Sequence, residues 1–152
     1  MGLDMYLTGD RFHVGFVYNP ETRQHEEIEP TYVDGFKVSS EKLEIGYWRK
    51  NAPLHTMIVN RFANGKDDCE PIVLSENNLR EIARLLRAKM LPTNAQSGGF
   101  FFGDEDWWEE CRKNAERDAE IFEKAAHWLE SGDKKGTGGA KFWNTVEYQA
   151  SW

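Results

Sequence analysis

Cysteine is scarce in this chain, and no metal-site spacing is present. Only two cysteines, Cys69 and Cys111, occur among 152 residues. They form no CxxC pair and have no nearby pair of histidines, which zinc knuckles and redox dithiols require. The acidic run around Cys69, residues 67–70, lacks the glycine and the terminal glutamate of a calcium loop. The sequence therefore predicts two reduced thiols, no metal and no cofactor.

A basic leader and a long apolar run are also lacking. Asp4 interrupts the opening apolar stretch, and no basic region precedes an apolar core of the kind found in a secretory signal. No run is long enough for a membrane helix. We therefore expect a cytoplasmic protein that makes no membrane contact.

Basic charge is in deficit. Lys plus Arg number 19 against 26 for Asp plus Glu, which gives a net charge of -7. Nonspecific binding to DNA or RNA depends on basic charge and is therefore unlikely from this composition. Hydrophobic residues reach 39% and aromatic residues 13%, enough for a folded core, and the length favours a single domain over residues 1–152.

Alternating and aromatic segments predict the strands. They are expected at residues 12–18, at 31–38 with a turn at Asp34-Gly35, at 42–49 and at 142–152. In segment 42–49, period-two alternation places Leu43, Ile45 and Tyr47 on one face. Residues 21–30 carry four glutamates and are expected to form a solvated loop.

Apolar stripes at helical spacing predict helices at residues 53–63, 75–90 and 104–131. Met90 is expected on the stripe of the second helix. Trp108, Phe122 and Leu129 are expected to be buried along the third. The fold class is thus α+β, a mainly antiparallel sheet of four or five strands packed on one face by two or three helices.

The segment 104–130 is strongly acidic, with ten acids against four bases. Glu109, Glu116, Glu120 and Glu123 repel one another, a cost that folding alone does not demand. A partner with a basic surface would make that cost useful, so these glutamates are candidate partner-binding residues. The alternative is a solvated face that maintains solubility.

Two further clusters are candidate ligand sites. Trp48, Arg49, Lys50 and His55 lie where a strand meets a helix start, and together they could hold an anion. Alternatively, Trp48 and His55 are core residues whose polar atoms are hydrogen-bonded, and the charged groups of Arg49 and Lys50 are solvated. Phe100 and Phe102 belong to a glycine-flanked loop that either plugs the core or forms a pocket or partner surface.

Several short motifs follow one another along the chain: MGLDMYL at 1–7, YWRKN at 47–51 followed by His55, DDC at 67–69, LPT at 91–93, SGGFFFG at 97–103 and YQASW at 148–152. In this order they resemble a family of small bacteriophage and prophage proteins of unassigned activity. The resemblance implies a phage accessory role in the cytoplasm of an infected bacterium and implies no reaction. The basic, glycine-rich segment 134–141 departs from the family pattern.

Two functions follow as hypotheses. The first is a non-enzymatic protein that binds a host protein through an acidic and aromatic surface, with self-association into a homo-oligomer as a further expectation. The second is a protein or enzyme that binds a nucleotide or similar anion through Arg49, Lys50, His55 and the Gly-Phe loop. Convergence of Trp48, Arg49, His55, Phe102 and Tyr148 on one cavity would favour the second hypothesis, and separate packing would favour the first.

Overall fold

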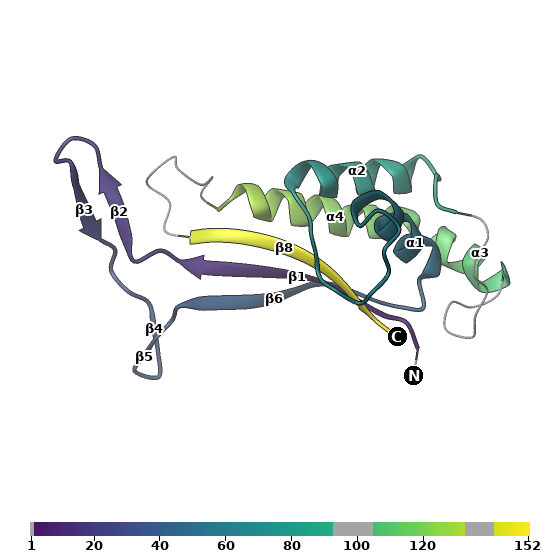
Figure 1. Cartoon of the computed structure of the whole chain (residues 1–152), viewed down its shortest axis with the longest axis horizontal. Helices are drawn as coiled ribbons and strands as arrows, with labels where there is room; N and C mark the ends of the chain where they lie inside the picture. The colour runs from purple at the N-terminus through teal and green to yellow at the C-terminus, as the bar shows by residue number, and fades with distance from the viewer. Residues whose placement is uncertain (1, 93–104, 133–141) are drawn as a thin grey trace.

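The computed structural model describes residues 2–92, 105–132 and 142–152 and has the expected α+β architecture (Figure 1). Its main sheet is antiparallel and has four strands in the order β6-β1-β8-β7. These strands are β6 (Ser40–Arg49), β1 (Asp4–His13), β8 (Phe142–Ser151) and β7 (Ile72–Val73). The closing strand expected at 142–152 is confirmed.

The central strand, β1, was not among the expected strands. Met5, Leu7 and Gly9 on β1 are buried and alternate with outward-facing residues. The strand expected at 12–18 is wrong, because β1 ends at His13 and a separate strand begins at Phe16. Between them the Gly15 carbonyl accepts a hydrogen bond from the Ile28 amide at 2.9 Å. That bond ties the chain to a hairpin outside the sheet.

Two hairpins project from the end of the sheet that lies away from the helices (Figure 1). The first pairs β2 (Phe16–Asn19) with β3 (Gln24–Glu27), and the second pairs β4 (Tyr32–Val33) with β5 (Phe36–Lys37). The expected turn in the second is present, with positive φ at Asp34 and Gly35. The solvated loop expected at 21–30 is wrong over β3, whose four residues are all exposed yet pair with β2.

Helices α1 (Ala52–Phe62), α2 (Glu76–Arg87) and α4 (Ala115–Glu130) cover one face of the sheet (Figure 1). Side chains cap the first two as their sequences indicate: Asn51 accepts from the Leu54 amide and Ser75 from the Asn78 amide. The expected position of Met90 is wrong. The left-handed residue Lys89 (φ 56°) follows the end of α2, and Met90 is 58% exposed.

The single helix expected at 104–131 is instead two helices, α3 (Glu105–Lys113) and α4. Asn114 separates them, and its side-chain amide donates to the Glu110 carbonyl at 3.2 Å. A side chain thereby replaces a backbone donor at the end of α3. Trp108 and Phe122 are buried as expected, whereas Leu129 is only partly buried.

A β-bulge in β6 overturns the expected alternation there. The pairing with β1 shifts between Leu7↔Gly46 and Thr8↔Glu44, so Ile45 is the extra residue. Leu43 therefore pairs with the buried Gly9 and Tyr47 with the exposed Tyr6, so the two point to opposite faces. Ile45 is partly buried, and Trp48 is turned toward the helices. The Trp48 ring stacks on Phe122 with centroids 5.4 Å apart. Over the described residues, no helix is long and apolar enough to cross a membrane.

Candidate functional site

The expected anion-binding cluster is divided between two places. Trp48 and Arg49 line a pocket beside α3 and α4, whereas His55 and Tyr148 lie beside the segment 66–70. Phe100 and Phe102 are outside the described residues. Of the five residues expected around one cavity, the structure therefore separates Trp48 and Arg49 from His55 and Tyr148.

His55 is buried in a hydrogen-bonded chain. Its Nε2 lies 2.9 Å from the Asp67 carboxylate, and its Nδ1 lies 2.7 Å from the Tyr148 hydroxyl. Burial raises the pKa of Tyr148 well above 10, so its O–H is retained at neutral pH. The Trp152 indole N–H also donates to Asp67, at 3.3 Å. Both ring nitrogens are satisfied, as the core-histidine alternative requires.

The space beside this chain is about 10 Å³, room for about one water. The hydrogen bonds connect α1, the segment before β7 and β8. The His55 cluster is thus a structural link in the fold, with no room for a substrate.

The pocket beside α3 has a volume of about 280 Å³. Asp118, on the first turn of α4 and only 1% exposed, forms part of its lining. The Trp48 indole N–H donates to Asp118 Oδ1 at 3.0 Å, and the Asn51 amide donates to Oδ2 at 3.3 Å. Burial raises the pKa of Asp118, although the two hydrogen bonds and the charge of Arg117 oppose the rise.

Cys111 lines the same pocket from α3. Burial, with the nearby Asp118 and Glu110 charges, raises the pKa of its thiol to about 11. The thiol is therefore protonated at neutral pH, and it donates to the Lys50 carbonyl at 3.7 Å. A protonated thiol is a weak nucleophile. The hydrogen bond from Cys111 instead connects α3 to the turn between β6 and α1. The Trp107 indole donates to the same carbonyl.

Asp118 and Asp67 were missed as site residues. Asp118 had a readable signal, because it lies three residues after Ala115 and four before Phe122, a polar residue on an apolar helical stripe. Asp67 had none, because its partner His55 is fixed only by the path of the chain between α1 and β7. Across the described ranges, no group of three His, Cys, Asp or Glu side chains is placed to hold a metal.

Three of the four candidate glutamates have partners within the fold. Glu116 and Glu123 on α4 both accept from Arg87 on α2, the first at 2.9 Å. Glu109 pairs with Arg112 within α3, and Glu120 is exposed. Intramolecular ion pairs thus account for much of the acidic charge that seemed costly in the sequence.

Exposed aromatic side chains gather on the hairpins and on the uncovered face of the sheet. Phe16, Tyr18, Tyr32 and Phe36 are the exposed aromatics of the hairpins. On the uncovered face, Tyr6 contacts Tyr47 and Phe12 contacts Trp143, with ring centroids 5.3 and 5.9 Å apart.

Comparisons of the chain with protein-family models, with curated proteins and with solved structures give no match.

Proposed function

We propose that this protein is a non-enzymatic phage accessory protein that binds a host protein in the cytoplasm of an infected bacterium. The binding surface is the hairpin surface, defined as the exposed side chains of residues 16–39. The observation that carries the proposal is the exposure of large apolar side chains on two hairpins that project beyond the helices.

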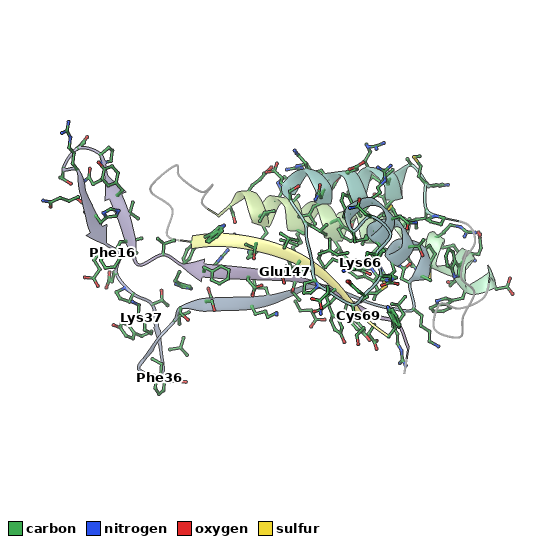
Figure 2. The ribbon with its side chains drawn as sticks, viewed as in Figure 1. Phe16, Phe36, Lys37, Lys66, Cys69 and Glu147 are labelled. Atoms are coloured by element: carbon green, nitrogen blue, oxygen red, sulfur yellow. The ribbon has the colours of Figure 1, made fainter. Side chains whose placement is uncertain are left out.

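Phe36 is 76% exposed and Phe16 is 60% exposed. Figure 2 places Phe36 at the end of the β4–β5 hairpin and Phe16 on β2. Isolated two-stranded hairpins are marginally stable in water, and apolar groups gathered on a protruding surface mark interaction sites. A partner that covers these side chains would offset both costs.

The charge of the hairpin surface indicates the chemistry of that partner. Residues 16–39 include five acids, Glu21, Glu26, Glu27, Glu29 and Asp34, against two bases, Arg23 and Lys37. A partner with an apolar groove flanked by basic side chains would complement it. Electrostatic steering should then make association faster at low salt.

The separation of Arg49 from His55 supports this reading over an enzyme built on those two residues. The ion pairs of Glu116 and Glu123 with Arg87 further support the hairpins, rather than the acidic helices, as the docking surface.

The test begins with capture and crosslinking of a partner from bacterial lysate and its identification by mass spectrometry. Affinity is then measured with the purified partner. The double variant Tyr32→Ser/Phe36→Ser should lower affinity at least about tenfold, since buried aromatic anchors carry most interface energy. Tyr6→Ser, on the uncovered sheet face, is the matched control.

The fourfold variant E109Q/E116Q/E120Q/E123Q tests the acidic helices separately, and it should leave affinity within about twofold if the hairpins dominate. Undiminished binding by the hairpin variant would refute the proposal, and loss only in the fourfold variant would move the surface to α3 and α4. Light scattering on the chain alone tests self-association. A dimer abolished by the hairpin variant would make a second copy the occupant.

A further inference from the structure

We propose that the pocket between β6, α3 and α4 binds a small anion with a planar heteroaromatic ring, of the mononucleotide class. This inference is independent of the hairpin surface. It moves the expected anion site away from Lys50 and His55 and onto residues of α3 and α4.

Two arginines line this pocket. Arg61, Arg80, Arg84, Arg87 and Arg112 each form a salt bridge with a glutamate. Arg49 and Arg117 are exposed and form no salt bridge with any described residue, although acids outnumber bases in the chain. Both line the one pocket. The charge of Arg117 also acts on Asp118, but neither guanidinium is held in a salt bridge by a described residue. Two such groups at one concave site are well suited to a phosphate, which they can bind through paired N–H groups.

An exposed aromatic ring also lines the pocket. Trp107 lines the pocket from α3 and is 40% exposed, whereas the ring of Tyr47 lies beside Tyr6 on the uncovered face of the sheet. Exposed aromatic side chains are stacking surfaces for heterocyclic bases, since every base has a π-face. Trp107 lies on a helix and its indole N–H donates to the Lys50 carbonyl, so this ring is part of the rigid fold.

Further polar side chains complete the lining of the pocket. Asp118 and Asn51 bring a carboxylate and an amide to the pocket. Beside the two arginines, its other polar lining residues are Asn114 and Glu110, and Glu110 pairs with Lys113. A carboxylate has about four lone-pair positions, and among the described residues two side-chain N–H donors, from Trp48 and Asn51, point at Asp118. It can accept a further hydrogen bond from a ring N–H or an exocyclic amine. The volume of about 280 Å³ lies at the low end for ligand pockets and suits one nucleotide at most.

Calorimetric titration of the whole chain with AMP, GMP, CMP and UMP tests the inference. At least one should bind saturably with a Kd below about 1 mM, and its nucleoside should bind at least about tenfold more weakly. Arg117→Gln and Arg49→Gln should each weaken binding about tenfold or more, as expected for loss of a charge-assisted hydrogen bond. Arg23→Gln is the matched control, because Arg23 also forms no salt bridge with a described residue but lies on the β2–β3 turn.

Each other outcome overturns the inference. Absence of saturable binding by all four nucleotides would exclude the class. Equal affinity for the nucleotide and its nucleoside would show that the arginines do not bind the phosphate. Equal affinity for the nucleotide and inorganic phosphate would show that the heteroaromatic ring makes no contribution to binding. Full affinity in Arg117→Gln, or an equal loss in Arg23→Gln, would place the nucleotide elsewhere. Melting curves of the variants show that they fold, which keeps these outcomes interpretable.

Discussion

Asp118→Ala is the substitution whose effect the structure specifies most fully. The carboxylate is buried, and it accepts hydrogen bonds from the Trp48 indole and the Asn51 amide, which are themselves buried. Alanine would leave both donors without an acceptor. It would also release the indole that stacks on Phe122.

An orphaned buried donor costs about 1–3 kcal/mol. Two donors are affected, but removal of a buried carboxylate recovers part of the loss. We expect Asp118→Ala to lower the free energy of unfolding by about 2–4 kcal/mol, or the Tm by roughly 4–16 °C for a chain of this size. Urea titration followed by circular dichroism measures the change, and a loss below about 0.5 kcal/mol would refute the reasoning.

The pH dependence gives an independent check. Because burial raises the Asp118 pKa above its ordinary 3.8, the folded state binds the proton more tightly than the unfolded state. The stabilisation from this linkage is fully present below pH 3.8 and is lost as the pH rises through the raised pKa. The gap in stability between the native chain and Asp118→Ala should therefore shrink from pH 4 toward pH 7. A gap that widens with pH would show that the folded protein favours the ionised carboxylate.

Other substitutions probe packing and the cysteines. Gly9→Ala should cost about 1–3 kcal/mol by denaturant titration, because its Cβ would lie 2.7 Å from the Trp128 ring; an unchanged midpoint would contradict close packing of α4 on β1. Trp108→Ala should cost about 3–5 kcal/mol, since the side chain is fully buried, and an unchanged melting curve would contradict that burial. Reducing agent should leave the Tm unchanged, because Cys69 and Cys111 are free thiols. EDTA should also leave it unchanged, because the described residues include no group of side chains placed to hold a metal. A shift with reducing agent would reveal a disulfide, and a shift with EDTA would reveal a metal.

The helices were largely predictable because their signals are local. The Ser75 cap and the apolar stripe of α2 lie within a dozen residues of each other. The break at Asn114 was less readable, since the apolar stripe continues through it. Strand β1 also had a local signal, the alternation of Met5, Leu7 and Gly9 with polar residues. That pattern begins at the start of the chain, without the turn residues that usually bound a strand.

The candidate site was harder to predict because it depends on distant pairings. The face on which Trp48 lies is set by the bulge at Ile45, which exists only against β1. The place of His55 is set by Asp67 and Tyr148, the latter 93 positions away in sequence. Residue types therefore indicated which side chains matter, while strand register decided which of them meet.

Charge has two different roles in this molecule. On α4, Glu116 and Glu123 share Arg87 and help to fix α2 against α4, so part of their negative charge is offset within the fold. On the hairpins, acids outnumber bases beside exposed aromatic rings, so that charge is available to a partner. Salt should therefore weaken both helix packing and partner association, but through different residues. Arg87→Ala should lower the Tm mainly at low salt and leave partner affinity unchanged, whereas a joint loss of stability and affinity would place the docking surface on the helices.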